Sequence, residues 1–275
     1  MSSPAARVQA EIGVFGGSGF YAFLDDVVEV PVHTPYGPPS AAVTVGTIEG
    51  RRVAFLPRHG VHHELPPHRV NFRANVWAMR ELGVTRLLGP CAAGSLTPSV
   101  RPGSFVVLDQ LVDRTNGRSA DTYFDGGVVG HVSFADPYCP ELRTVALSAG
   151  EAVGVNMHAE GTVVVVPGPR FSTRAESQYF RRQGWSVINM TQHPEAYLAR
   201  ELGMCYCGIA LVTDFDTGVE GEPGIEPVAM DRVFAVLREN VERTRALLLR
   251  AIPEISSERR ACSCASALDQ GPLRS

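Results

Sequence analysis

The chain has 275 residues, of which 44% are hydrophobic, and its 25 basic and 29 acidic side chains leave a formal charge of −4. This length and apolar content suffice for one large core. The balanced charge excludes a strongly basic surface for nucleic acid or anionic membrane, so a small-molecule ligand is favoured. The first residues lack a secretory signal pattern, and the apolar runs are too short for a membrane span. We therefore expect a cytoplasmic protein.

Short β-rich runs alternate with amphipathic stretches along the chain. We predict strands over residues 11–17, 40–50, 51–60, 85–90, 104–113, 161–169, 186–190 and 205–216. A hairpin is expected at Gly50-Arg51-Arg52. Helices are predicted over residues 70–83, 141–154, 174–184, 194–203 and 227–249. The alternation indicates an α/β fold over 12–255, with an N-terminal arm over 1–11 and a flexible C-terminal tail over 256–275.

The cysteines form no familiar metal motif. There are six, and they include no paired CxxC spacing, so we predict no structural metal. Cys262 and Cys264 are a candidate redox or disulfide element with Cys205 or Cys207, and Cys139 with Cys205 is a second candidate pair. A reducing compartment favours free thiols instead.

Three segments at predicted strand ends suit an anion. Residues 13–20, GVFGGSGF, combine glycines with the hydroxyl of Ser18, although the alternative is a simple tight turn. Arg58 and His59 follow the next strand as a cationic fork beside an imidazole, although such pairs are often solvated surface. Cys91 and Ala92 begin a predicted turn of small residues. These segments converge if the strands are parallel.

Later segments offer groups for a planar ligand. Phe171 is able to lie against a base or sugar, or to belong to the core. Thr191 offers a hydroxyl at a strand end, or serves as a helix cap. Asp214 and Asp216 follow an apolar strand at alternate positions, so they share a face if the strand continues. Two close carboxylates raise one pKa and let one group donate a proton, whereas the alternative is a solvated acidic loop.

These segments together resemble the trimeric nucleoside phosphorylases, in particular those acting on 5′-methylthioadenosine. The shared motifs, in chain order, are GGSGF, HTPYGPPS, RHG, VNFRAN, LDQLVDRT, GPRFSTRAES, INMT..PE and TDFD. The resemblance spans residues 12–255. It implies a single α/β domain around a mixed, partly barrel-like central sheet flanked by helices. It also implies a homotrimer with sites at subunit boundaries.

The resemblance further implies roles for individual residues. The residues that would bind phosphate are Ser18, Arg58, His59, Cys91, Ala92 and Thr191. Met190 would pack against the ribose and Phe171 beside sugar and base. The purine would face Ser172, Asp214, Phe215 and Asp216. Met230 and Val233, with His131 of a neighbouring subunit, would line the pocket for the 5′ substituent.

A carboxylate at the base favours adenine, because the 6-amino group donates a hydrogen bond that Asp214 accepts. In this mechanism phosphate is the nucleophile, Arg58 orients it, Asp214 protonates N7, and Asp216 tunes Asp214. Phosphate is the co-substrate, so we expect no metal or organic cofactor. The expected role is purine and methionine salvage. Alternatives are a 6-oxopurine or methylthioinosine phosphorylase, a hydrolytic nucleosidase, and a nucleoside-binding module without catalysis.

Overall fold

A computed structural model describes residues 8–16, 24–118, 120–127, 129–219, 225, 230–258 and 262–268. The prediction for Ser18 lies outside these residues. The helix that contains Met230 and Val233 is described, but their side chains are not.

The strands extend the predicted set. They are β1 (Ile12–Gly16), β2 (Asp25–Val30), β3 (Val43–Ile48), β4 (Arg51–Pro57), β5 (Arg86–Ser95), β6 (Phe105–Val107), β7 (Gln110–Asp113), β8 (Met157–His158), β9 (Thr162–Val165), β10 (Val187–Asn189) and β11 (Cys205–Phe215). Sequence patterning missed β2 and β8. Strand β2 is a largely exposed edge strand with acidic residues, which hide its apolar pattern.

The helices lie where their periodicity predicts them. They are α1 (Phe72–Glu81), α2 (Pro140–Ala152), α3 (Arg174–Arg182), α4 (Gln192–Glu201) and α5 (Met230–Glu254), with short 3-10 turns η2 (Pro67–Arg69), η3 (Thr217–Val219) and η4 (Ala265–Leu268). Asn71 caps α1 by accepting from the Ala74 N–H, and Thr173 with Glu176 forms a capping box on α3. These local contacts fix where both helices begin.

The sheet mixes parallel and antiparallel pairs. Strand β1 is parallel to both β4 and β5, and β3 and β4 form the predicted hairpin with Glu49 and Gly50 at positive φ in its turn. The long strand β5 pairs with β11 along its whole length, with β1 near its start and with β10 at its end. The sheet therefore divides at β5, where one branch continues through β10 and β9 and another through β11 and β6.

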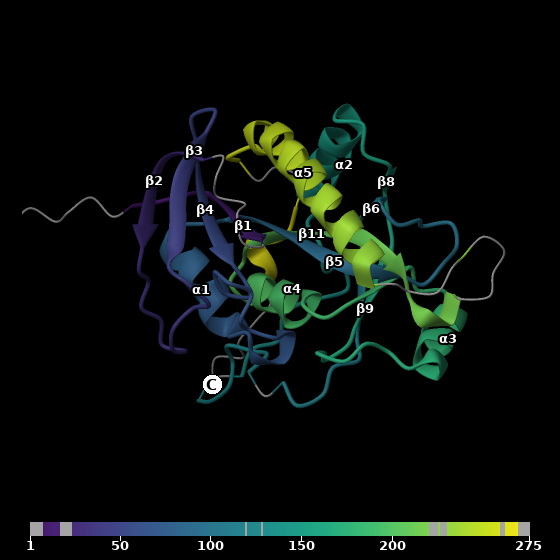
Figure 1. Cartoon of the computed structure of the whole chain (residues 1–275). Coiled ribbons are helices and arrows are strands. Elements are labelled where there is room, and N and C mark those ends of the chain that lie inside the picture. The colour runs from purple at the N-terminus through teal and green to yellow at the C-terminus, as the bar shows by residue number, and fades with distance from the viewer. Residues whose placement is uncertain are drawn as a thin grey trace, which may run out of the picture.

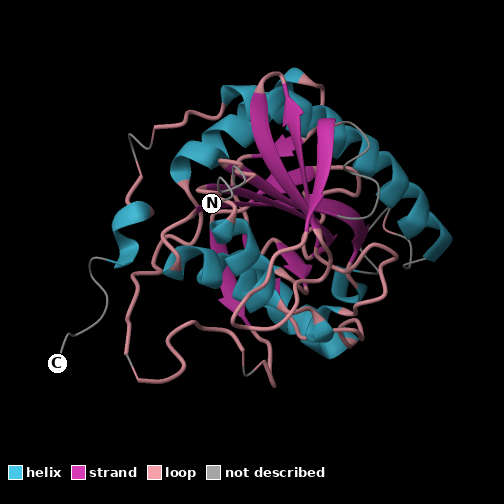
Figure 2. Ribbon diagram, turned by 90° about the vertical axis from the view of Figure 1, so that its left-hand side faces the viewer, coloured by secondary structure: helices cyan, strands magenta, loops and turns pink. Residues whose placement is uncertain are grey.

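Helices cover both faces of this sheet. Figure 1 shows α2 and α5 on one side and α1 and α4 on the other, and Figure 2 shows the strands enclosed between helices. Each face has its own apolar core, one including Met79 and Leu198, the other including Leu142 and Leu247. The single α/β domain with a mixed sheet flanked by helices is confirmed.

Part of the segment expected to be a flexible tail is packed. Cys264 and Ala267 are buried, and the side chain of Arg86 donates to the carbonyls of Ser256 and Glu258. Residues 262–268 thus contradict that expectation, because their contacts are with distant segments that composition does not reveal. None of the helices in the described chain combines the length and apolar character of a membrane span.

Candidate active site

The first predicted anion site begins where β1 and β4 end side by side. Gly16, the last residue of β1, is in register with Pro57, and Arg58 follows directly. The Arg58 N–H donates to the Gly16 carbonyl at 3.2 Å. The expected convergence of these two strand ends is therefore confirmed.

Arg58 is held in a buried ion pair. Its Nε and Nη2 donate to the two carboxylate oxygens of Glu195 at 2.8 and 2.7 Å, and Nη1 donates to the Pro90 carbonyl at 2.9 Å. Burial opposes the charge of Arg58, but Glu195 raises the net pKa. Tyr206 completes the arrangement by donating its O–H to Glu195 at 2.6 Å. Arg58 is thus fixed in orientation and permanently charged.

His59 is set up as a neutral ring. Its Nδ1 lies 2.9 Å from the Leu65 carbonyl, which only accepts, so Nδ1 carries the proton. Burial and the nearby charge of Arg58 lower the pKa of His59 to about 4. At neutral pH its free Nε2 is consequently an acceptor, suited to a protonated phosphate oxygen rather than a bare one.

The predicted turn at Cys91 and Ala92 is wrong. Both residues lie inside β5, which pairs in parallel with β11 from Arg86 to Ser95 and keeps the chain extended. Ala92 is nevertheless exposed, between buried Cys91 and Ala93. The S–H of Cys91 points to the Ile209 carbonyl, and burial raises its pKa to about 12. This side of β5 therefore presents backbone and small side chains.

Thr191 follows β10 on the other side of β5. It occupies the cap position of α4, but its hydroxyl makes no cap bond and accepts from Asn189 Nδ2 at 3.1 Å. The backbone N–H groups of Thr191 and Gln192 donate hydrogen bonds to the side-chain carbonyl oxygen of Asn189, which therefore caps the helix in place of Thr191. The Thr191 O–H remains a donor for a ligand, and the capping alternative does not describe this residue.

The two carboxylates lie at the carboxyl end of β11. Asp214 is opposite Gly94 of β5 and accepts from the Thr213 hydroxyl at 2.6 Å. Burial raises the pKa of Asp214, and burial raises that of Asp216 to about 6, with the charge of Asp214 adding to the effect. Oδ2 of Asp216 is buried and has no partner among the described residues. The two carboxyl groups are therefore weaker acids than free aspartates and do not lie in a solvated loop.

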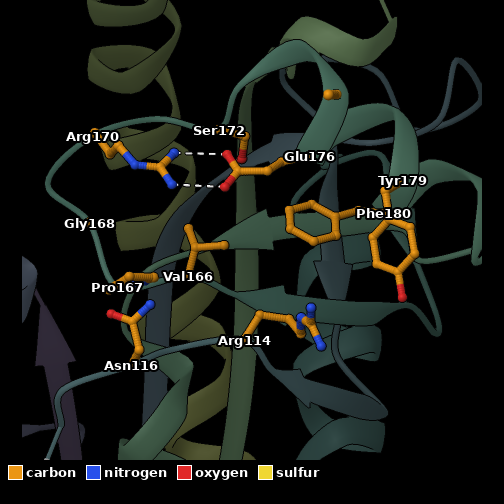
Figure 3. Close-up of a pocket in the computed structure, with 11 residues that line it drawn as sticks. Arg114, Asn116, Val166, Pro167, Gly168, Arg170, Ser172, Glu176, Tyr179 and Phe180 are labelled. Carbon is orange, nitrogen blue, oxygen red and sulfur yellow. Dashed lines mark hydrogen bonds and ion pairs between the residues drawn. The ribbon is translucent and has the colours of Figure 1, made fainter.

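A pocket of about 450 Å³ lies beside α3. Figure 3 shows Arg170 and Glu176 in a two-bond ion pair at one end and Arg114 near Tyr179 at the other. Of the predicted site residues in the described chain, Ser172 alone lines it, with its hydroxyl buried and lacking a described partner.

The remaining predicted residues are spread around this region. Met190 and Phe215 are half-buried, whereas His131 is exposed and Phe171 is 62% exposed. The Met190 carbonyl accepts from Arg118, which fixes the end of β10. Phe171 is therefore not a core residue, and its ring is open to a ligand or a neighbour.

Strand β5 joins the two ends of the site. Arg58 reaches it at Pro90 and Asp214 at Gly94, four residues further along. At about 3.3 Å per residue this is about 13 Å, with exposed Ala92 midway. Sequence reasoning missed the buried partners of these groups, namely Glu195, Tyr206, Asn189, Gln192 and Ser177. Only the Asx turn of Asn189, at the end of β10, offered a local signal.

Comparison with known proteins places this arrangement in a family. The model of the phosphorylase superfamily matches residues 11–253. The chain belongs to the phosphorylase superfamily. Among its phosphorylase relatives is a purine nucleoside phosphorylase of Streptomyces coelicolor, 55% identical over 96% of both chains. An S-methyl-5′-thioadenosine phosphorylase of Mycolicibacterium smegmatis is 55% identical over 92% of this chain and 94% of its own.

Solved structures of the superfamily agree with the fold. A crystal structure of a methylthioadenosine phosphorylase from an Antarctic soil metagenomic library superposes with a TM-score of 0.90 at 38% identity. The match covers 97% of this chain and 93% of that one. Similarity along nearly the whole length means that the elements carrying the site belong to the shared phosphorylase fold.

Proposed function

We propose that this protein cleaves 5′-methylthioadenosine with inorganic phosphate, giving adenine and 5-methylthioribose 1-phosphate. The observation that carries the proposal is the pair of half-buried Asp214 and buried Asp216, one strand segment away from the fixed cation of Arg58. The Mycolicibacterium smegmatis relative and the structurally similar protein from the Antarctic soil library are both named as methylthioadenosine phosphorylases, which supports the same substrate.

At the phosphate end, the charge of Arg58 and the hydroxyl of Thr191 favour an anion, together with the backbone at Ala92. His59 is neutral and accepts through Nε2, so it suits the P–OH of a monoprotonated phosphate. We propose that Ser18 also binds phosphate. Because the donors are fixed before phosphate binds, little is lost in ordering them.

At the base end, Asp214 and Ser172 face the purine, with Phe215 beside them. A protonated Asp214 donates to N7 while its other oxygen accepts from the 6-amino group. Asp216 acts through Asp214: burial and the charge of Asp214 raise the pKa of Asp216, so the two groups resist ionising together. This favours an adenine leaving group.

The reaction balances without another reagent. A phosphate oxygen bonds to C1′ as the C1′–N9 bond breaks, the bonding electrons pass to the purine, and Asp214 supplies the proton to N7. Arg58 stabilises the phosphate and Asp214 the developing purine anion. We propose that no metal or organic cofactor takes part in this step.

The sugar end is completed by a neighbouring subunit in our proposal. Phe171 is 62% and Val129 63% exposed, so both apolar side chains are available to a neighbouring subunit. We propose a homotrimer in which His131 reaches the adjacent site and Met230 and Val233 line the 5′ pocket. An apolar pocket should favour methylthio over hydroxyl sugars by about 1–3 kcal/mol. Light scattering should give three chains per particle.

The cellular setting follows from the substrates. We propose a cytoplasmic enzyme of purine and methionine salvage, since nucleosides and phosphate are cytoplasmic metabolites and both products are reusable.

The test is release of free base from methylthioadenosine, adenosine and inosine, each with and without phosphate. Phosphate-dependent adenine, fastest from methylthioadenosine, is expected. Preference for inosine would support a 6-oxopurine enzyme instead. Hydrolysis without phosphate would point to a nucleosidase. Tight binding without turnover would leave a nucleoside-binding module and refute the proposal.

A further inference from the structure

Four cysteines from distant segments meet at one point. Cys139 precedes α2, Cys205 begins β11, and Cys262 and Cys264 lie just before η4. Their four sulfur atoms all lie within 4.8 Å of one another, and Cys205 and Cys262 are 3.5 Å apart. We call this set the thiol cluster.

We propose that the thiol cluster binds one zinc ion as a structural site with four cysteine ligands. Tetrahedral zinc has Zn–S distances of about 2.3 Å, which place any two of its sulfurs about 3.8 Å apart. Here all four sulfurs lie within 4.8 Å of one another, so they form a compact group of the size that one zinc ion requires rather than a row. Soft thiolate ligands in this geometry select zinc over hard cations such as magnesium.

Hydrogen-bond donors lie around the sulfurs of the thiol cluster. The backbone N–H of Leu142 contacts Cys139 at the start of α2, and that of Cys264 contacts Cys262. The buried Arg86 donates through Nη1 to the Cys205 sulfur at 3.0 Å. Four thiolates around zinc carry a net charge of −2, and an N–H shell with a nearby cation stabilises such a charge. A buried thiol that binds no metal is neutral and does not require such donors.

Cys262 is the partly exposed member of the thiol cluster, which gives an entry path for the ion.

The site is structural because of where it lies. Cys205 is at the amino end of β11, whereas Asp214 is nine residues further along, at about 3.3 Å per residue and so about 30 Å away. The ion would tie the C-terminal segment to α2 and β11, next to the Arg86 contacts with Ser256 and Glu258. The sequence-based prediction of no structural metal overlooked this cluster because its ligands lie up to 125 residues apart in the sequence, from Cys139 to Cys264.

The first experiment measures metal in the full-length protein, purified without chelator, by plasma mass spectrometry. We expect about one zinc per chain, released stoichiometrically when a mercurial reagent titrates the thiols, as detected with a colorimetric zinc indicator. Cobalt substitution should give the visible bands of tetrahedral cobalt–thiolate coordination. Absence of metal with two disulfides in the intact mass, or four thiols that alkylate freely in metal-free protein, would overturn the proposal. Iron instead of zinc would overturn the assignment of the ion.

Variants separate the cluster from cysteine loss in general. The double variant Cys262→Ser/Cys264→Ser should lower zinc content at least about tenfold, since it removes two of the four ligands. Cys207→Ser is the matched control: Cys207 is buried in the same strand as Cys205 but outside the cluster, and zinc in this variant should remain at wild-type stoichiometry. Retention of full zinc by the double variant contradicts the site. The zinc content of wild-type protein decides the question even if that variant fails to fold.

Discussion

Replacing Glu195 by Gln should destabilise the protein strongly while conserving volume. Glu195 is 1% and Arg58 3% exposed, and the two share a pair of hydrogen bonds of 2.7–2.8 Å. Oε1 of Glu195 also receives the Tyr206 O–H. In the variant the charge is lost, and the amide nitrogen faces the Nε–H of Arg58, donor against donor. Removing one partner of such a buried pair costs about 3–5 kcal/mol.

The assay is equilibrium unfolding in urea at a fixed chain concentration, because stability depends on concentration if the chain assembles. The control is Glu239→Gln, which removes the exposed i,i+4 partner of Arg243 and should cost about 0.3–0.5 kcal/mol. The KM for phosphate should also rise in Glu195→Gln, since Arg58 loses its fixed orientation. A loss of stability below about 1 kcal/mol would refute the claim that the pair is buried and tightly coupled.

Three further predictions concern the two ends of the site. Asp214→Asn should lower kcat/KM for methylthioadenosine by about 10²–10⁴-fold while the KM for phosphate stays unchanged, and steady-state kinetics check both; an unchanged kcat/KM contradicts the acid role. The raised pKa of Asp216, from 3.8 to about 6, means that its contribution to stability is present below about pH 4 and is lost as pH rises through 6, by about 3 kcal/mol. Thermal unfolding across pH should show this loss in the wild type and not in Asp216→Asn. Thr191→Ala should raise the KM for phosphate by about tenfold or more through loss of one donor to a charged ligand, and an unchanged KM would remove Thr191 from the site.

The sequence predicted those features whose cause is local. Alternating strands and helices, the hairpin after Ile48 and the meeting of the β1 and β4 ends all depend on nearby apolar patterns and turn residues. The acidic pair was also visible, because Asp214 and Asp216 follow an apolar strand directly.

Features that depend on distant partners were not visible. Arg58 is 137 residues from Glu195, and nothing near either one indicates that they pair. The thiol cluster gathers three separate segments in the same way. A local pattern predicts which groups are present at a strand end, but only the fold decides which of them satisfy one another and which stay free for a ligand.

The small residues of β5 show why one misinterpreted motif still marked the site. The small residues suggested a turn, but glycine is needed in β5 because buried side chains lie directly against its backbone. A Cβ on Gly89 would lie 2.1 Å from the Tyr206 hydroxyl oxygen and 3.0 Å from Oε1 of Glu195. On β11, a Cβ on Gly208 would lie 2.3 Å from Oε1 of Gln192. Buried polar side chains thus press against bare strand backbone, which lets the network that orients Arg58 fit beneath the sheet. The same lack of side chains leaves the β5 backbone open near Ala92, so the requirements of the network and of a bound ligand select the same small residues.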